Sequence, residues 1–326
     1  MIPDETPPTD TAASFVPVDF HALARRFGRE RLARRLRIQA EHTAKGPGQG
    51  KGFLRLESRI NIYDLLRFAL RVSGQLERGR RNFLDIRVEH NRLPVRGLPP
   101  AFEGFRLLQI SDLHADIRPD LADAVIRVVQ GLPVDHAVFT GDFRNGTFAD
   151  YADGVRASLR VRRAIDAPAH GVLGNHDFIE MVPGLEAGDL AMLLNEVAVL
   201  ERDGQRLALT GIDDAHFYRT DDLPGTLAGV PAGVPVLLLS HAPEIYAEAA
   251  SHDVPAMLCG HTHAGQICLP GGWAPIRNGN FPRQLVKGSW RIGDLHGYTS
   301  RGTGGCAVDV RFNCPPEVTI HTLLGT

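Results

Sequence analysis

Short runs of Val, Leu, Ile and Phe recur along this chain from residue 105 onwards, and polar residues follow each run directly. Such bounded apolar runs predict buried strands. In five places the residues after the run are types that bind metals, and parallel strands that end at one edge of a sheet bring such residues together. The five runs are Phe105–Ile110, Ala137–Thr140, Gly171–Leu173, Val236–Leu239 and Ala256–Cys259.

The polar residues after these runs form five short motifs, and seven of their side chains are candidate ligands: two carboxylates, one amide and four imidazoles. The motifs are Asp112-Leu113-His114, Gly141-Asp142, Gly174-Asn175-His176-Asp177, Ser240-His241 and Gly260-His261-Thr262-His263. This set can hold two divalent ions, with one carboxylate bridging them. Oxygen donors mixed with imidazoles favour Mn, Fe or Zn over Ca or Mg. Two such ions, about 3.5–4 Å apart, activate water and hold a phosphoryl group for in-line attack.

The rest of this region predicts helices between the strands and further strands near the end. Helices are predicted at Pro119–Gln130, Asp153–Ile165, Glu186–Glu196 and Glu244–Ser251, and strands at Val197–Leu200, Arg206–Gly211, Gly305–Val310 and Val318–Leu323. Early alternation of strands and helices followed by late strands indicates an α/β fold with more than one sheet.

Residues 1–100 differ from the rest in composition. Residues 1–20 are acidic and rich in Pro and Thr, and we expect a disordered tail there with no signal peptide. No apolar run approaches the roughly 18 residues of a membrane span, so we expect a cytoplasmic protein. Residues 1–100 carry 19 Lys and Arg against 11 Asp and Glu, a net charge of +8, whereas residues 101–326 carry −10.

Two basic helices are predicted in residues 21–100, which we interpret as an extension and linker before a catalytic domain at 101–326. They span Phe20–Ala44 and Leu54–Leu76, with a break at Gly46–Gly50. A strand at Phe83–Val88 and a linker at Leu93–Pro100 follow. The second helix, with arginines up to residue 81, has an apolar face typical of helices in a membrane interface. Packing on the catalytic domain or on a second copy is the alternative; nucleic-acid binding is disfavoured by scarce aromatics.

These motifs, in this order, resemble those of the calcineurin-like metallophosphoesterases over roughly two thirds of the chain, from Phe105 onwards. The stretches Gly260–Pro270, Ser300–Gly302 and Arg311–Val318 resemble the bacterial YkuE/YaeI-like phosphodiesterase branch, which is often membrane-associated. The resemblance implies a four-layer αββα sandwich of two mixed sheets. It also implies hydrolysis of a phosphodiester or pyrophosphate bond through a hydroxide that bridges two metal ions.

The resemblance also implies a role for each site residue. Asp112, His114 and His263 would hold one metal, Asn175, His241 and His261 the other, and Asp142 would bridge both. His176 would face the phosphate as a catalytic group rather than a ligand.

One position departs from the pattern of many relatives, which place an Asp three residues after the bridging Asp to orient the catalytic histidine. Here that residue is Asn145. An Asn carbonyl accepts a hydrogen bond but brings no charge to favour imidazolium. The sequence therefore predicts that His176 acts as a neutral hydrogen-bond donor.

Three residues are candidate substrate contacts: Asn145 itself, Asp214 after a predicted strand and Arg301 in a Gly-rich loop. Three function classes remain open. They are a two-metal phosphoesterase, a non-catalytic metal-binding scaffold and a nuclease-like enzyme, the last disfavoured by the acidic charge of residues 101–326. Some relatives cleave UDP-2,3-diacylglucosamine in lipid A synthesis, and a basic amphipathic helix would suit such a lipid-linked substrate.

Overall fold

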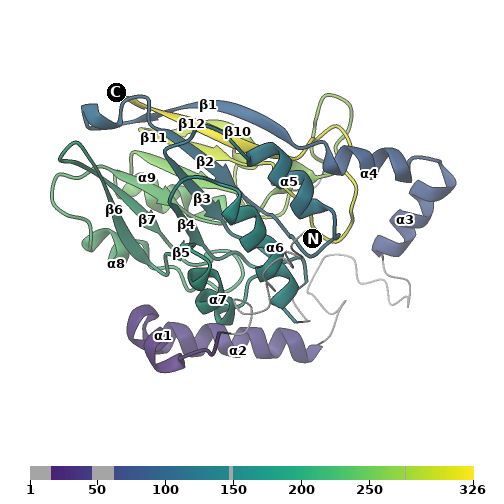
Figure 1. The fold of residues 1–326 in the computed structure, drawn as a ribbon, viewed down its shortest axis with the longest axis horizontal. Helices are drawn as coiled ribbons and strands as arrows, with labels where there is room; N and C mark the ends of the chain where they lie inside the picture. The colour runs from purple at the N-terminus through teal and green to yellow at the C-terminus, as the bar shows by residue number, and fades with distance from the viewer. Residues whose placement is uncertain (1–15, 46–61, 147–149, 276) are drawn as a thin grey trace, which may run out of the picture.

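A computed structural model describes residues 16–45, 62–146, 150–275 and 277–326. Most of the predicted acidic tail, the break at Gly46–Gly50 and the first part of the predicted second helix lie outside the described residues. The described chain forms two six-stranded mixed sheets that are packed face to face, with helices on their outer faces (Figure 1).

The first sheet has the strand order β1-β12-β2-β3-β4-β5. Its strands are parallel to their neighbours except where β12 pairs with β2 in antiparallel orientation. The strands are β1 (Arg87–Val95), β2 (Arg106–Ile110), β3 (His136–Thr140), β4 (Ala169–Val172), β5 (Ala191–Met192) and β12 (Glu317–Gly325).

The second sheet has the order β10-β11-β9-β8-β7-β6, with a parallel centre and one antiparallel pair at each edge. Its strands are β6 (Glu196–Arg202), β7 (Gln205–Gly211), β8 (Val236–Leu239), β9 (Ala256–Cys259), β10 (Gly288–Ile292) and β11 (Leu295–Thr299).

Alternation of side chains along the strands separates the core into layers. Leu107 of β2 and Leu209 of β7 belong to the cluster between the sheets, whereas their neighbours Leu108 and Ala208 face the outer layers. The outer face of the first sheet is covered by α5 (Leu121–Val129), α6 (Ala152–Arg163) and α7 (Val182–Ala187). The second sheet is covered by α8 (Leu223–Ala228) and α9 (Tyr246–Ser251).

The first N-terminal helical segment, α1 (Phe20–Phe27) and α2 (Arg29–Lys45), packs against this body beside α7 (Figure 1). Leu23, Phe27 and Leu32 join the core on the outer side of the first sheet. Arg35 of α2 is fully buried. Both of its contacts to Asp213 are short, 2.5 and 2.6 Å, and its Nη2 donates to the Asp177 carbonyl at 2.9 Å. These helices are therefore part of the packed structure.

The second helical segment consists of α3 (Ile62–Val72) and α4 (Leu76–Leu84), separated at Gly74, which adopts a φ of +70°. Leu66 and Leu70 of α3 pack with Leu76 against Val308 and Val310. The other side of α3 is open to solvent, and the helix lies at the periphery, away from the sheets (Figure 1).

The structure confirms eleven predicted elements approximately and corrects several. The strands corresponding to β2, β3, β4, β6, β7, β8, β9 and β12 and the helix α5 were predicted at or near their positions, as were α6 and α9. The predicted strand at Phe83–Val88 and linker from Leu93 are wrong, because residues 87–95 form β1 within the first sheet. The predicted helix Glu186–Glu196 is wrong as well: α7 ends at Ala187, where Gly188 contacts Leu159, and β5 follows.

The predicted strand Gly305–Val310 is a loop. Its carbonyls at Val308 and Val310 accept hydrogen bonds from the side chain of Gln266, at 2.7 and 3.2 Å, rather than from a neighbouring strand. The two valines still face the interior, which explains their apolar pattern.

We predict that Arg35→Met destabilises the fold by about 3–5 kcal/mol, because it leaves the buried Asp213 carboxylate without its cation. Urea unfolding followed by circular dichroism measures the loss. Arg31→Met is the matched control on the same helix: its ion pair with Asp222 is partly exposed and is worth about 0–1 kcal/mol. Equal losses in the two variants would contradict a special contribution from Arg35.

Candidate dinuclear metal centre

The predicted ligands lie at the carboxyl ends of parallel strands in both sheets. Asp112 and His114 follow β2, Asp142 follows β3, Asn175 follows β4, His241 follows β8, and His261 and His263 follow β9. The loops of the two sheets bond to one another, since His241 Nδ1 lies 2.8 Å from the Thr140 carbonyl and His261 N donates to Asp112 Oδ1 at 3.0 Å. The centre is therefore formed jointly by both sheets.

The backbone of these loops is bent tightly at the ligands. Five of the seven adopt positive φ, a region that non-glycine residues rarely occupy: Asp112, His114, Asp142, His261 and His263, with φ from +41° to +69°. Backbone hydrogen bonds stabilise the bends, such as Asp112 N to the Gly141 carbonyl at 3.0 Å and His114 N to the Asp142 carbonyl at 2.9 Å. Such strain is typical of functional sites.

Glycines before the ligands allow the loops to approach closely. A Cβ on Gly174 would lie 2.2 Å from Asp142 Oδ1, and one on Gly260 would lie 1.8 Å from Ser111 Oγ and 2.3 Å from Asp112 Oδ2. The glycine in each of these motifs is therefore required by contact with a ligand carboxylate.

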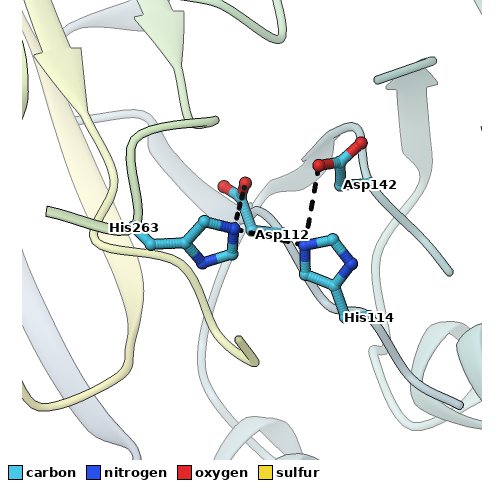
Figure 2. A group of neighbouring side chains, drawn as sticks. All are labelled: Asp112, His114, Asp142 and His263. Atoms are coloured by element: carbon cyan, nitrogen blue, oxygen red, sulfur yellow. Dashed lines mark hydrogen bonds and ion pairs between the residues drawn. The ribbon is translucent and has the colours of Figure 1, made fainter. Parts of the chain in front are cut away.

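The first group of converging side chains consists of Asp112, His114, Asp142 and His263, whose ligand atoms all lie within 4.8 Å of one another (Figure 2). His114 Nε2 is 3.5 Å from Asp142 Oδ2, and His263 Nε2 is 3.4 Å from Asp112 Oδ1. The Nε2 atoms of His114 and His263 are 3.2 Å apart. His114 Nδ1–H donates a hydrogen bond to the Arg144 carbonyl at 2.7 Å, so that the lone pair of His114 Nε2 faces the group.

The second group consists of Asp142, His241 and His261, with Asn175 between the two histidines. Asn175 Oδ1 is 3.0 Å from His241 Nε2 and 2.8 Å from His261 Nδ1, and His241 Nε2 is 3.3 Å from Asp142 Oδ2. Asp142 thus belongs to both groups, as expected for a bridging ligand.

Burial sets the charge of these groups. It lowers the pKa of His114 to about 3 and the pKa values of His261 and His263 well below their usual range, so these rings are neutral, the form that binds metals. Burial raises the pKa of Asp112 to about 6. Burial acts the same way on Asp142, but the surrounding imidazoles outweigh it and hold the pKa of that carboxyl well below its usual range. His241 differs from the other three ligand histidines: burial opposes a charge on its ring, but Asp142 outweighs burial and raises its pKa well above the usual range, so this ring would lose a proton on binding a metal. This buried set of imidazoles, an amide and carboxylates fits two divalent cations.

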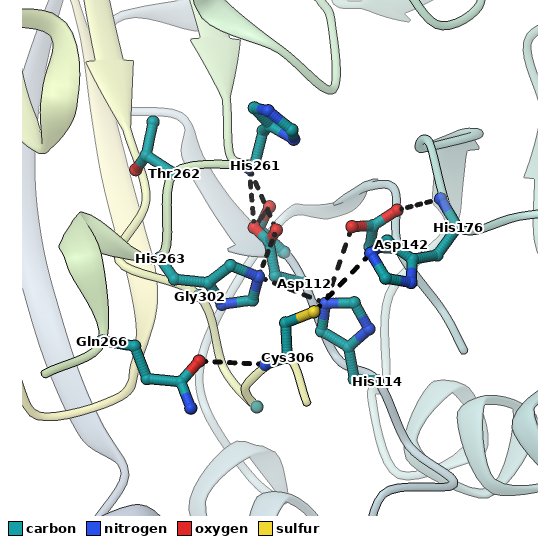
Figure 3. A network of polar contacts seen from close by, with 12 residues as sticks. Asp112, His114, Asp142, His176, His261, Thr262, His263, Gln266, Gly302 and Cys306 are labelled. Atoms are coloured by element: carbon teal, nitrogen blue, oxygen red, sulfur yellow. Dashed lines mark hydrogen bonds and ion pairs between the residues drawn. The ribbon is translucent and has the colours of Figure 1, made fainter. Parts of the chain in front are cut away.

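His176 lies beside Asp142 and contacts Asn145 differently from the prediction (Figure 3). Its Nδ1–H donates to the backbone carbonyl of Asn145 at 2.7 Å, while the Asn145 side chain accepts from Ala307 N at 3.0 Å. Burial opposes a charge on His176, but Asp142 and then Cys306 outweigh it and raise the pKa of the ring to about 10. The protein groups alone therefore favour a charged ring, and the neutral state of His176 stays a prediction for the centre with cations on Asp142.

The family model for the calcineurin-like phosphoesterase superfamily domain matches residues 105–274 of the chain. The chain belongs to this superfamily. It is therefore a metal-dependent phosphoester hydrolase.

This phosphoesterase is similar in sequence to several curated proteins, among them the following three. It is 29% identical over 240 residues to the uncharacterized metallophosphoesterase YkuE of Bacillus subtilis, covering 70% of this chain and 82% of the relative. It is 28% identical to the phosphodiesterase YaeI of Escherichia coli, covering 68% and 82% of the two chains. It is 25% identical to the UDP-2,3-diacylglucosamine pyrophosphatase LpxG of Chlamydia muridarum, covering 70% and 87%.

The side chains of the two other predicted substrate contacts of the phosphoesterase bond to other groups of the protein. Asp214 is fully buried, and its carboxylate accepts hydrogen bonds from the backbone N–H groups of His216, Phe217 and Tyr218. The guanidinium of Arg301 is paired with Glu317 and Glu89. Asp214 therefore caps a turn and Arg301 joins β1 to β12, while a contact of either residue with substrate stays a prediction.

Three residues at the centre were not predicted. Asp177 accepts hydrogen bonds from the backbone N–H groups of Asp142, Phe143 and Gly174, and so joins the loops after β3 and β4. Fully buried Arg311 donates to the carbonyls of Arg301, Gly302 and Gly304 beside His263. Cys306 Sγ lies 3.7 Å from His176 Nε2 (Figure 3). Asp177 and Arg311 stand in recognisable motifs, whereas no local pattern marks Cys306.

We predict that Gly260→Ala weakens metal binding about tenfold or more, because the new methyl group would displace Ser111 and the Asp112 carboxylate. Metal content after dialysis measures the effect. Gly325→Ala is the control, since a Cβ there makes only ordinary contacts, at 3.4 Å or more. Unchanged metal content in Gly260→Ala would show that the loop adapts.

Proposed function

We propose that the protein hydrolyses a phosphodiester or pyrophosphate bond with two divalent cations, held by the seven predicted ligands. The observation that carries this proposal is the membership of Asp142 in both groups of converging ligands. Asp112, His114 and His263 would complete one cation site, and Asn175, His241 and His261 the other. Two cations at this centre would lower the pKa of water between them and offset charge on the phosphoryl oxygens.

The protein's own residues would position the substrate and supply a proton. His176 is held by its backbone N–H, which donates to Asp142 Oδ1 at 2.9 Å, and by its Nδ1–H, which donates to Asn145. This leaves Nε2 to donate to a phosphoryl oxygen or to the leaving oxygen. Cations on Asp142 would reduce the negative charge that raises the pKa of His176, and so would ease release of that proton.

We predict metal-dependent hydrolysis of an aryl phosphodiester that exceeds hydrolysis of the matching monoester. Apo protein is reloaded separately with Mn, Zn or Mg and assayed on both substrates. Asp142→Asn should abolish activity by removing the shared ligand, whereas His176→Ala should keep both ions and lose about 10²- to 10⁴-fold in kcat. Full activity of Asp142→Asn would rule out the two-metal proposal, and two bound ions without hydrolysis would favour a selective pocket or a non-catalytic scaffold.

A lipid-linked pyrophosphate is the second candidate substrate, supported by the likeness to LpxG and by the exposed face of α3. Leu65, Phe68 and Val72 are 56%, 63% and 71% exposed on this helix. Such a continuous apolar surface with nearby arginines suits a membrane interface that contains anionic lipids. No helix in the described parts of the chain is long and apolar enough to cross a bilayer.

The position of α3 supports a link between this surface and the metal centre. Arg67 Nη2 donates to the carbonyl of Ala307 at 3.0 Å, and Leu66 and Leu70 pack on Val308 and Val310. The same loop carries Cys306 next to His176. A lipid-linked substrate whose chains enter the interface at α3 would therefore present its phosphate close to the cations.

We predict that the protein floats with vesicles containing anionic phospholipid and that Leu65→Ser/Phe68→Ser/Val72→Ser does not. Val199→Ser, at an exposed apolar position on the distant strand β6, is the control and should float. Point variants are needed because truncation near Pro99 would remove β1 from the first sheet. If the intact protein and the triple variant both stay at the bottom of the gradient, the membrane proposal fails.

A further inference from the structure

A carboxylate and an imidazole form a hydrogen-bonded pair behind the second group of ligands. His216 Nδ1 lies 2.7 Å from Glu244 Oε1, and both side chains are largely covered. The His216 ring is stacked obliquely on the His261 ring, with 4.2 Å between centroids. One potential ligand atom from each of His216, Glu244 and His261 lies within 4.8 Å of the other two.

The two ring nitrogens of His261 differ in their contacts. Its Nδ1 faces Asn175 Oδ1 at 2.8 Å, toward the proposed cation, so its Nε2 points away from the centre. Figure 3 shows this ring directed away from His263 and Cys306. His261 Nε2 is buried without a hydrogen-bond partner, and so is Glu244 Oε2. A buried donor and a buried acceptor each destabilise the fold when they lack a hydrogen-bond partner.

The other ligand histidines show what such a nitrogen usually contacts. His114 and His241 each direct Nδ1 to a backbone carbonyl, at 2.7 and 2.8 Å, which fixes the tautomer that leaves Nε2 free for a cation. His261 would bind through the opposite nitrogen, so its proton would reside on Nε2, and among the described residues Glu244 is the carboxylate grouped with His261 and His216.

We propose that Glu244 is a positioning residue for His261: its carboxylate accepts the Nε2–H hydrogen bond and so directs Nδ1 at the second cation. This inference rests on the proposed two-metal function. A carboxylate behind a ligand imidazole fixes the orientation of the ring and increases its basicity toward the metal.

The local structure holds Glu244 in place for this task. Glu244 lies in the short 3₁₀ turn Pro243–Ile245, directly after His241, so this segment carries one ligand of the second cation and the residue that would orient another ligand, His261. His216 occupies the other carboxylate oxygen. Gly279 covers the pair, since a Cβ there would lie 2.4 Å from Glu244 Oε1.

The test compares metal binding by Glu244→Gln and Glu248→Gln, two isosteric changes four residues apart. Glu248 lies on α9 and belongs to no group of converging metal ligands among the described residues. Mn²⁺ binding is measured by equilibrium dialysis, and Co²⁺ binding by its visible absorption, which reports the coordination of each ion. We expect two ions per chain in the wild type. In Glu244→Gln, one of them should bind about 10- to 100-fold more weakly, with a changed Co²⁺ spectrum and the other ion unaffected.

Equal affinities in the two variants would overturn the inference and leave the proposed function intact. A third ion per chain, lost in Glu244→Gln, would also overturn it, because Glu244 would then be a ligand itself. Absence of bound ions from the wild type would overturn the two-metal proposal, and this inference with it. Unfolding of the apo proteins, expected to be alike in both variants, separates a site effect from a loss of fold.

Discussion

The buried carboxylate of Asp142 is the constraint on which the architecture depends. It is 1% exposed, and imidazoles from both sheets approach it, His114 at 3.5 Å and His241 at 3.3 Å. A buried charge is tolerated only where hydrogen bonds and opposite charges or metal ions surround it. Strands of both sheets must therefore end at one place, and their loops must bend sharply enough to turn the ligands inward.

The interactions that meet this constraint extend far from the centre. The Asp177 carboxylate joins the loops after β3 and β4, and the Asp177 carbonyl accepts from Arg35 of α2. Arg35 in turn neutralises Asp213 in the loop after β7. A continuous series of hydrogen bonds thus connects the N-terminal helices to the residues around Asp142, so these helices support the loops that form the site.

The ligand set was predictable from sequence because its signals are local. Each motif follows an apolar run, and the seven residues converge because their strands end at a common edge. By contrast, the contacts of Asn145 and Arg301 within the protein could not be predicted, because their partners Ala307, Glu89 and Glu317 lie on distant segments. The loop at Gly305–Val310 has the composition of a strand, but the side chain of Gln266, about 40 residues earlier, donates to its Val308 carbonyl and accepts from Cys306 N. Helix α7 ends before Gly188, where a Cβ would lie 2.3 Å from Leu159, a packing contact that local propensity does not reveal.

The strand order of the first sheet has a consequence for the folding of the chain. Strand β12 lies between β1 and β2, although about 220 residues separate it from β1 in sequence. While the chain is being synthesised, β1 has no neighbour to pair with, and β2 presents an open edge of unpaired backbone groups. Such edges are prone to pair with other chains. The centre of this sheet is therefore completed late, and intermediates that lack β12 are the stage at which the protein is most exposed to aggregation.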